Sequence, residues 1–315
     1  MSQSSFFRPV LLSVVLCTYN NDKRLSVTME SLRLCNIPEK LNWQLVVVNN
    51  NCTDETDSIV EKYCQILPIT YVHEPMQGLS RARNAGINAS KGEFIVFIDD
   101  DVRPVPKWLE VYWNAYLERP EGYYFGGPVE SEFESERPAP DVLKMSPTCI
   151  KGLSYGIKSR QLEGHSYFLA ANWGCPASAL QVVGGYDVSK GLNPTAGRLI
   201  TGEETDLMDR LQGIGYRPWY LADALIYHFV PRNKTTLRHI ANKIEAISFC
   251  EAQKCVDRLE GKRIFGVPRW MYKRLISLYA RYYMNKLKGD SAALHYIKAR
   301  RFLGEVKFHY YQKKK

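Results

Sequence analysis

Three adjacent carboxylates, Asp99, Asp100 and Asp101, follow directly on the apolar residues 94–98. Neighbouring like charges repel one another, and a divalent cation relieves that repulsion. The hard cations Mg²⁺ and Mn²⁺ prefer such oxygen ligands. A solvated turn is the ordinary alternative for a pair of aspartates, but the preceding strand is apolar on both faces and is expected to be buried. The residues therefore favour a metal site at the end of a buried strand.

The segments that position these carboxylates show two alternating patterns of apolar residues, one typical of strands and one typical of helices. The apolar runs "PVLLSVVLCTYN", "WQLVVVNNN", "LPITYVHEP" and "EFIVFID" predict strands, whereas residues 23–34, residues 53–64 and the stretch "GLSRARNAGINAS" predict helices. Strand–helix alternation with continuously apolar strands is typical of a parallel sheet covered on both faces. We therefore expect an α/β fold with a central, mostly parallel sheet and helices on both faces.

Polar side chains cluster where each predicted strand ends, and ligands bind beyond the carboxyl ends of the strands in such sheets. One such cluster after one strand could be chance, but four in register along one edge predict a site. The four clusters are Thr18, Tyr19 and Asn20; Asn49, Asn50, Asn51 and Asp54; His73 and Glu74; and the three aspartates.

A second carboxylate pair, Glu203 and Glu204, lies in "TGEETDL". This stretch predicts the start of a helix, with Thr201 as its cap and Gly213 or Gly215 as its end. A carboxylate that approaches an acceptor hydroxyl can serve as a general base. A solvated acidic first turn is the alternative interpretation.

Several classes of function lose support. The chain has no GxxxxGK[ST] motif and no GxGxxG after its first strand, which disfavours P-loop chemistry and NAD binding of the usual type. Arg81 and Arg83, in the third predicted helix, are candidates to neutralise a diphosphate or to hold a neighbouring carboxylate.

The net charge of +9 is unevenly distributed. Residues 236–315 contain 19 Lys/Arg and 6 Asp/Glu, so this region carries +13 and residues 1–235 carry −4. Because residues 1–235 have no excess of basic residues, the sequence does not predict that this main part of the chain binds nucleic acid. Basic residues that alternate with Trp and Tyr at helical spacing suit an anionic membrane surface, which we assign to residues 267–315. The alternative is a helical extension that packs its aromatic side chains on the body.

Localisation follows from two further observations. The chain contains no run of about 18 apolar residues, so the sequence predicts no transmembrane helix. The first 20 residues make a poor signal peptide, because Arg8 is their single basic residue and their apolar run continues into a predicted core strand. We expect a cytoplasmic protein, with peripheral association to the inner face of the membrane.

The chain resembles the family-two glycosyltransferases, inverting nucleotide-sugar enzymes with the fold called GT-A. The matching stretches occur in the family's order over about residues 10–230: "SVVLCTYNN", "LVVVNNNCTDET", "GLSRARNAGI", "FIDDDVRP", "GGYD" followed by "GEETDL", and "IYHF". The resemblance implies metal-dependent transfer of a sugar from a nucleoside-diphosphate sugar, a UDP-sugar in the first place, to an acceptor hydroxyl. It implies a glycan or lipid-linked acceptor and a role in synthesis of polysaccharide, glycolipid or another cell-surface glycan.

The resemblance also assigns roles to individual residues. Glu204 would be the catalytic base, with Glu203 as the second choice. Asp101 would bind Mn²⁺ or Mg²⁺, with Asp99 and His228 as further metal contacts. The nucleotide and donor would be bound by Thr18, Tyr19, Asn20, Asn49, Asn50, Arg83, Asp99 and Asp100. The donor-sugar and acceptor side would be lined by Asn172, Trp173 and Gly174 of "ANWGCP".

Two positions depart from the family's pattern. Asn49 and Asn50 stand where the loop that reads the base commonly carries aspartate, which makes uridine specificity less secure because an amide both donates and accepts. Glu203 and Glu204 stand where the family usually has Glu-Asp, so a base at Glu204 would reach one methylene further.

The expected organisation has three parts. Residues 1–9 form an N-terminal tail, residues 10–235 form the GT-A domain, and residues 236–315 form a basic amphipathic helical extension. Within the domain, 10–101 is the nucleotide-binding half and 102–235 the acceptor-binding half. Two other functions stay open: a nucleotidyltransferase acting on a sugar phosphate, and a non-catalytic protein that binds nucleotide sugar or membrane.

Overall fold

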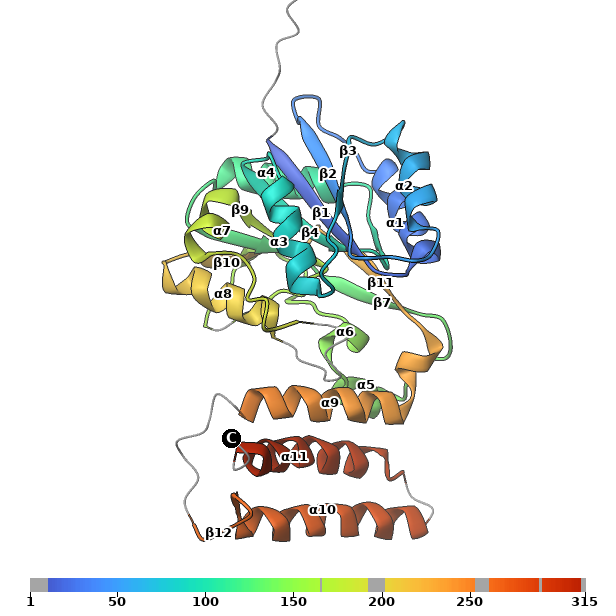
Figure 1. Cartoon of the computed structure of the whole chain (residues 1–315). Helices are drawn as coiled ribbons and strands as arrows, with labels where there is room; N and C mark the ends of the chain where they lie inside the picture. The colour runs from blue at the N-terminus through green and yellow to red at the C-terminus, as the bar shows by residue number, and fades with distance from the viewer. Residues whose placement is uncertain (1–10, 165, 192–201, 253–260, 289–290, 313–315) are drawn as a thin grey trace, which may run out of the picture. The chain divides into compact units, whose positions relative to one another are not determined.

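The computed structural model describes residues 11–164, 166–191, 202–252, 261–288 and 291–312, and its chain divides into two compact units. Unit 1 comprises the described residues of 11–130, 152–191 and 202–229, and unit 2 those of 131–151 and 230–312. The division differs from the expected boundary after residue 235 in two respects. It falls at Val230, and residues 131–151 belong with the C-terminal helices. Figure 1 shows the elements of both units.

Unit 1 is built on an eight-stranded sheet in the order β3-β2-β1-β4-β9-β6-β10-β8. The strands β3, β2, β1 and β4 are parallel, while β9 is antiparallel to both of its neighbours. The predicted mostly parallel sheet is confirmed. Its strands are β1 (Leu12–Thr18), β2 (Trp43–Asn49), β3 (Ile69–His73), β4 (Phe94–Asp99), β6 (Tyr123–Gly126), β8 (Arg160–Gln161), β9 (Asn172–Pro176) and β10 (Arg217–Tyr220).

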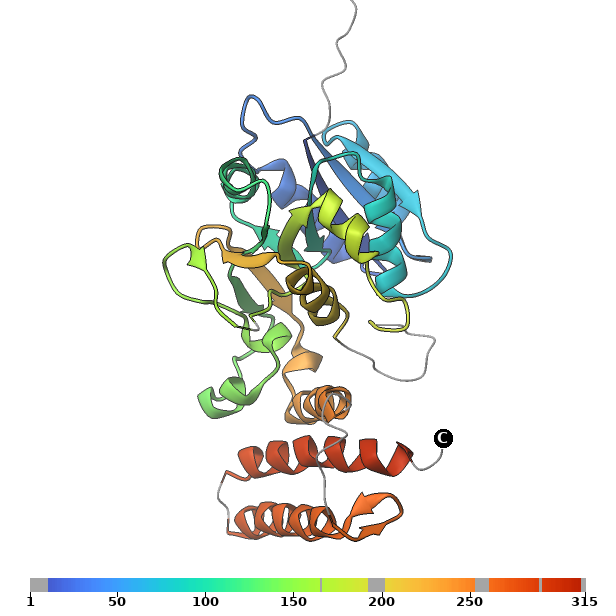
Figure 2. The ribbon, with the colours of Figure 1, turned by 90° about the vertical axis from the view of Figure 1, so that its left-hand side faces the viewer.

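Helices cover both faces of this sheet, as expected (Figure 2). Along β1, Val14 and Leu16 pack into one core and Val15 into the other. Because both faces are buried, a strand such as β1 has no polar face and reads as a continuous apolar run. The first core contains side chains of α1 (Asp22–Arg33), α2 (Thr56–Cys64) and α4 (Trp108–Glu118), and the second contains those of α3 (Leu79–Ala89), α7 (Ala177–Val183) and α8 (Glu203–Gly213).

The carboxyl ends of the parallel strands meet at one edge. Thr18 of β1 pairs in register with Asn49 of β2, and Asn49 pairs with His73 of β3. On the other side of β1, Cys17 is opposite Asp99 of β4. The polar clusters predicted from the sequence therefore follow neighbouring strands at one edge of the sheet.

A three-stranded sheet, in the order β5-β11-β7, follows the aspartates. It contains β5 (Val102–Pro104), β7 (Val129–Phe133) and β11 (Ile226–Val230). His228 lies inside β11, opposite Val102 of β5. Strand β7 has the acidic sequence VESEF. Its alternating burial is that of a strand, a signal hidden by its acidic composition.

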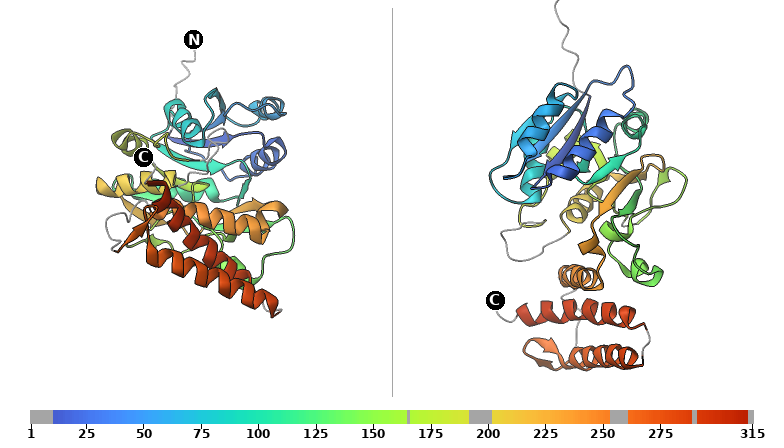
Figure 3. Two further views of the ribbon diagram at one scale, coloured as in Figure 1. Left: turned by 60° about the horizontal axis from the view of Figure 1, so that its bottom comes forward. Right: turned by 90° about the vertical axis from the view of Figure 1, so that its right-hand side faces the viewer.

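Unit 2 consists mainly of helices, and α11 lies between α9 and α10 (Figure 3). Gly304 of α11 allows this approach, because a Cβ there would lie 2.3 Å from the backbone oxygen of Glu245 in α9. The expected helical extension is interrupted by a short hairpin. The elements are α5 (Pro140–Met145), α6 (Thr148–Lys151), the 3₁₀ helix η2 (Arg232–Thr235), α9 (Leu237–Ala252), the hairpin strands β12 (Arg263–Ile264) and β13 (Val267–Pro268), α10 (Arg269–Leu287) and α11 (Ala293–Gln312).

None of the helices in the described part of the chain has the length and apolar character needed to cross a membrane.

A single amide joins several elements of unit 1 at the start of β9. Asn172 is fully buried, and its Oδ1 accepts hydrogen bonds from Trp108 Nε1 at 2.8 Å and Tyr112 OH at 2.9 Å. Its Nδ2 donates to the backbone oxygens of Pro128, at 2.9 Å, and Ala224, at 2.7 Å. All four hydrogen-bonding positions of the amide are used, so Asn172 ties helix α4 to two loops.

We predict that Asn172→Ala lowers the free energy of unfolding by about 3 kcal/mol, because several buried polar groups then lose their partner and each costs about 1–3 kcal/mol. Urea unfolding followed by tryptophan fluorescence measures the change. Asn114→Ala, at an exposed position of α4, is the matched control and should change stability little. Equal stability of the two variants would contradict the structural role of Asn172.

Candidate active site

A buried guanidinium connects the end of β4 with the start of α8. Arg83, in α3, is 2% exposed. Its Nη2 lies 3.2 Å from Oδ1 of Asp99, and its Nη1 lies 3.3 Å from Oε1 of Glu203. The ring of Tyr186 lies 5.3 Å from the guanidinium carbon. The sequence offered Arg83 as a partner for a diphosphate or for a neighbouring carboxylate, and in the structure it has two carboxylate partners.

The electrostatics of Arg83 follow from these contacts. Burial by itself would lower the pKa of the guanidinium, but the acidic groups of Tyr186, Asp99 and Glu203 outweigh burial and raise it. A buried cation is costly unless it is paired and hydrogen bonded. The two carboxylates therefore keep Arg83 charged, and the guanidinium in turn fixes their positions.

The two glutamates at the start of α8 have different surroundings. Glu203 is buried against Arg83. Glu204 has a buried Oε2 that finds no hydrogen-bond partner among the described residues. Burial, together with the charge of Glu203, raises the pKa of Glu204 to about 8. Of the pair, Glu204 is the carboxylate whose oxygen is not committed to a protein partner and whose proton affinity suits a general base near neutral pH.

Helix α8 begins as the sequence suggested, with one change. Its cap residue is Gly202, which has a φ of 101°, and the helix ends at Gly213. The expected cap, Thr201, lies outside the described residues. A positive φ is readily adopted by glycine alone among common residues, so Gly202 sets the direction in which the two glutamates leave the turn.

The three aspartates have separate partners. Asp100 Oδ1 accepts a hydrogen bond from Asn21 Nδ2 at 2.8 Å. Asp101 Oδ1 lies 3.4 Å from Nε2 of His228. The hydroxyl of Thr28 donates to the backbone oxygens of Asp100 and Val102, which holds the turn between β4 and β5.

Crowding perturbs these carboxyl groups. Burial and the charge of Asp101 raise the pKa of Asp100 to about 7. Burial also raises the pKa of Asp99, against the opposing charge of Arg83. Both shifts mean that ionising the cluster is costly in the protein alone, and that a cation placed there would be stabilised by it.

The predicted metal ligands come from two parts of the chain, the end of β4 with the turn after it and strand β11. In the described segments, no group of three or more His, Cys, Asp or Glu side chains is arranged to hold a metal ion. Asp101 and His228 form a pair, and their oxygen and imidazole ligands suit Mn²⁺. Mg²⁺ and similar ions commonly take one or two carboxylates and complete their shell with water and substrate phosphates. The residues present therefore fit a metal that is shared with a diphosphate.

The turn after β1 contains the three residues expected to bind the nucleoside. Thr18 is buried, and its hydroxyl lies beside the carboxyl of Asp100. Tyr19 is 40% exposed. Asn20 has a φ of 48°, and its Oδ1 accepts a hydrogen bond from Thr53 N at 2.7 Å. This turn is thus held against the loop after β2 and presents an exposed aromatic ring.

Asn49 and Asn50 do not present free amides to a ligand. Each is 4% exposed. Asn49 Nδ2 donates to Asp57 and Tyr71, and its Oδ1 accepts from Cys52 N. Asn50 Nδ2 donates to the backbone oxygens of Glu74 and Met76, and its Oδ1 accepts from Gly78 N. Both side chains hold the loops after β2 and β3 in this structure, and their contact with the base stays a prediction.

The assignment of Asn172, Trp173 and Gly174 to the donor-sugar and acceptor side also needs correction. The amide of Asn172 is fully used inside the core, as described above. Trp173 is fully buried and stacks on Phe97 with ring centroids 5.0 Å apart. A Cβ on Gly174 would lie 2.6 Å from the backbone oxygen of Ile95. All three belong to the packing of β9 against β4.

Three contributing residues were not assigned from the sequence. Asn21 holds Asp100, Thr28 holds the turn after it, and Tyr186 lies against Arg83. Asn21 and Tyr186 stand within the quoted stretches "SVVLCTYNN" and "GGYD", so a signal was present for both. Thr28 lies inside α1, and only the folded chain reveals its contact.

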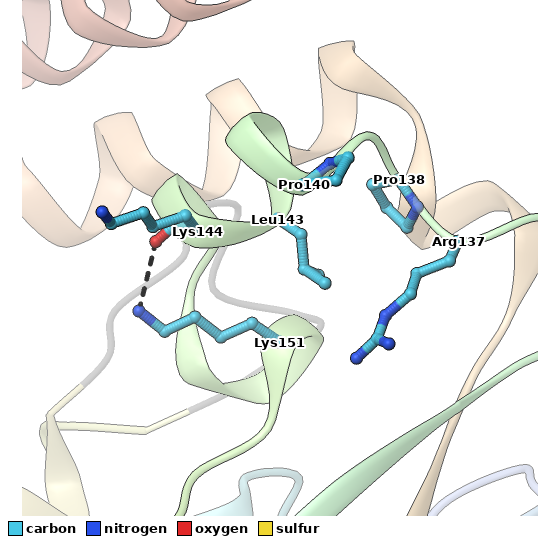
Figure 4. A pocket seen from close by; sticks show the side chains of 6 residues that line it. All are labelled: Arg137, Pro138, Pro140, Leu143, Lys144 and Lys151. Carbon is cyan, nitrogen blue, oxygen red and sulfur yellow. Dashed lines mark hydrogen bonds between the residues drawn. The ribbon is translucent and has the colours of Figure 1, made fainter.

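A pocket of about 390 Å³ lies in unit 2, away from these residues in the sequence. Figure 4 shows the side chains that line it: Arg137, Pro138, Pro140, Leu143, Lys144 and Lys151. Its charged groups are all cationic, and Lys151 Nζ donates to the backbone oxygen of Lys144 at 3.4 Å. The pocket has no carboxylate or histidine among its lining residues, unlike the edge of the sheet in unit 1.

Comparisons of the sequence with known proteins agree with the geometry. The model of the family described as Glycosyl transferase family 2 matches residues 13–168. The succinoglycan biosynthesis protein ExoM of Rhizobium meliloti is 33% identical over 100 residues, which cover 31% of this chain and 32% of that protein. The pre-mycofactocin glycosyltransferase of Mycobacterium tuberculosis is 28% identical over 222 residues, covering 69% and 42%. The matches thus span less than half the length of each relative.

Solved structures share the fold. S. aureus TarS, residues 1–349, has a TM-score of 0.54 at 16% identity, covering 97% of this chain and 92% of that one. The mannosyltransferase PcManGT of Pyrobaculum calidifontis, solved with GDP-Man and Mn²⁺, has a TM-score of 0.61 at 16% identity, covering 98% and 89%. The expected GT-A fold is confirmed. Together with the matched family model, it shows that the chain belongs to glycosyl transferase family 2.

Proposed function

We propose that the protein transfers a sugar from a nucleoside-diphosphate sugar to an acceptor hydroxyl, with inversion at the anomeric carbon. The observation that carries the proposal is the environment of Glu204. Its Oε2 has no hydrogen-bond partner among the described residues, its pKa is raised to about 8, and the neighbouring Glu203 is held by Arg83. This arrangement suits one carboxylate for proton transfer and the other for holding the site together.

The donor is proposed from two lines of support. TarS has been solved with UDP-GlcNAc and with UDP, and PcManGT with GDP-Man. In this chain, the exposed ring of Tyr19 and the buried hydroxyl of Thr18 follow β1 at the sheet edge, and Thr18 lies beside the carboxyl of Asp100. We propose that the nucleoside diphosphate binds there. We take a UDP-sugar as the first candidate and a glycan or lipid-linked saccharide as the acceptor.

A divalent cation would be held by Asp101 and His228, with Asp99 nearby. When bound, Mn²⁺ or Mg²⁺ supplies positive charge to the diphosphate of the donor. The residues fit such an ion because the clustered carboxyl groups are costly to ionise without one. Asp100, oriented by Asn21, is proposed to contact the ribose and the sugar.

The chain's own residues account for the proposed proton transfer. Glu204 accepts the proton of the acceptor hydroxyl as its oxygen forms a bond to the anomeric carbon. The bond from that carbon to the diphosphate oxygen breaks on the opposite side, so the nucleoside diphosphate leaves with the bonding electrons and the configuration inverts. Throughout the reaction Arg83 holds Asp99 and Glu203 in place, one at each end of the site. The displacement is direct, so no covalent enzyme intermediate forms.

Donor binding can be tested by thermal shift with UDP, GDP and their sugars in the presence of Mn²⁺. A ligand at about 100 times its Kd stabilises the folded state by about 2.7 kcal/mol. We expect stabilisation by a nucleotide to require Mn²⁺ and to be lost in Asp101→Asn. Asp223→Asn, at a side chain that is 66% exposed, should respond like the unmodified protein. Metal-independent stabilisation of Asp101→Asn would exclude Asp101 as the metal ligand.

The catalytic assignment predicts different losses in the two glutamates. Glu204→Gln should lower the rate of nucleoside-diphosphate release from the donor by at least about 100-fold, since it removes the base and leaves donor binding intact. Glu203→Gln should mainly destabilise the protein, by about 2 kcal/mol, because it weakens a buried ion pair. Rates and melting temperatures of both variants distinguish the roles. Full activity of Glu204→Gln would reject it as the base.

A pH dependence follows from the raised pKa of Glu204. A base acts in its ionised form, so kcat/KM should rise with pH and level off above about 8. In Glu204→Gln the residual rate should lack this rise. Steady-state kinetics across the neutral and mildly alkaline range measure the profile. An identical rising limb in the variant would assign that ionisation to another group.

A further inference from the structure

We infer that helix α10 and the hairpin before it form a docking surface for an anionic phospholipid bilayer. This inference goes beyond the proposed reaction and does not depend on it. We call this surface the α10 face and define it by the exposed apolar residues Ile264, Phe265, Ile276, Tyr283, Met284 and Leu287, with the exposed cations beside them.

Helix α10 uses one side for packing within unit 2. Met271 is buried, and Leu275 and Leu278 are half-buried in a core completed by Phe302 and Val306 of α11. These α10 residues are spaced three and four apart, so they lie on one face of the helix. The opposite face is therefore turned away from α11.

Large apolar side chains occupy that opposite face. Leu287 is 88% exposed, Ile276 is 68% exposed and Tyr283 is 57% exposed. Their spacings of seven and four residues place them in one stripe along the helix. A water-soluble surface gains nothing from such a stripe, whereas a bilayer interface buries it.

The charges around the stripe have one sign. Residues 261–288 contain eight Lys/Arg and no Asp/Glu. Lys273 and Lys286 are exposed along α10, and Lys262 and Arg263 are exposed at the start of the hairpin. One-signed cations beside an apolar and aromatic stripe are complementary to anionic lipid headgroups that lie over acyl chains.

The tip of the hairpin supplies an independent observation. Phe265 and Gly266 connect β12 to β13 with φ values of 49° and 82°. Glycine adopts such angles readily, but phenylalanine does so at a cost in energy. Phe265 is nevertheless 65% exposed, so packing within the protein does not repay that cost. A large apolar side chain held outward at a turn between Arg263 and Arg269 suits insertion among lipids.

Vesicle flotation of the full chain tests the inference. We use phosphatidylcholine vesicles alone and vesicles of phosphatidylcholine mixed with phosphatidylserine. The expected result is flotation with the anionic vesicles and little flotation with the neutral ones. Because the assay contains neither nucleotide sugar nor acceptor, its failure is distinct from a failure of the proposed reaction.

Two sets of variants separate the contributions. The first combines Phe265→Gly, Ile276→Gln and Leu287→Gln, and its matched control is Leu117→Gln with Ile157→Gln, at residues that are 57% and 94% exposed in unit 1. The second combines Lys273→Glu with Lys286→Glu, and its control is Lys40→Glu with Lys91→Glu, at exposed positions of unit 1. Both α10 sets should weaken partitioning by more than about ten-fold, and both controls should leave it nearly unchanged.

Each contrary outcome overturns the inference. The absence of flotation with anionic vesicles would show that the α10 face does not bind lipid. Flotation that is lost in the charge variant but kept in the apolar variant would overturn the part of the inference that assigns the apolar stripe and Phe265 to the lipid contact, because charge alone would then account for binding. Equal loss in an α10 set and its control would place the lipid contact elsewhere. Phe265→Gly alone guards against misfolding, because glycine relieves the positive φ, and it should also weaken partitioning.

Discussion

The pairing of the buried Arg83 guanidinium with two carboxylates is the interaction on which the candidate site depends. A buried cation must be neutralised. Here one partner, Asp99, lies at the end of β4, and the other, Glu203, lies at the start of α8, 120 positions along the chain from Arg83. The same contacts give the two glutamates different properties. Glu203 is committed to Arg83, whereas Glu204, one residue later, keeps an oxygen that no described residue satisfies. One structural ion pair thus leaves two neighbouring glutamates in different surroundings.

The crowding of acidic groups at the sheet edge is the second constraint. Asp99 and Asp100 both have raised pKa values because burial disfavours their ionised forms. Natural sequences retain such local conflicts mainly at functional sites, where another interaction compensates them. In the protein itself, Arg83 compensates one aspartate and Asn21 hydrogen bonds another. A bound cation beside Asp101 would complete the compensation, which is why the carboxylates, and not the basic pocket of unit 2, mark the site.

The sheet and its functional edge could be predicted from sequence, whereas the exact partners of several side chains could not. Periodicity was sufficient for β1, since Val14 and Val15 had to bury opposite faces of the sheet. It could not separate Asn172, which holds the core, from a polar residue that faces substrate. That distinction depends on Trp108 and Tyr112, whose polar atoms reach the amide only after α4 has packed. The partners of the Asn49 amide, Asp57 and Tyr71, were unpredictable for the same reason, because a polar residue near a site has no sequence signal that distinguishes structural support from ligand contact.

The roles of the two C-terminal helices, α10 and α11, also could not be distinguished from the sequence. Both α10 and α11 contain basic and aromatic residues in comparable style, so composition alone assigns them one role. Packing separates them: α11 lies between two helices and buries Ile297 and Phe302, whereas α10 buries Met271 alone. Apolar side chains on α11 are therefore explained by the core of unit 2. Those on the outer face of α10 contribute nothing to that core, and together with the one-signed charge beside them they are accounted for by the lipid-binding surface inferred above.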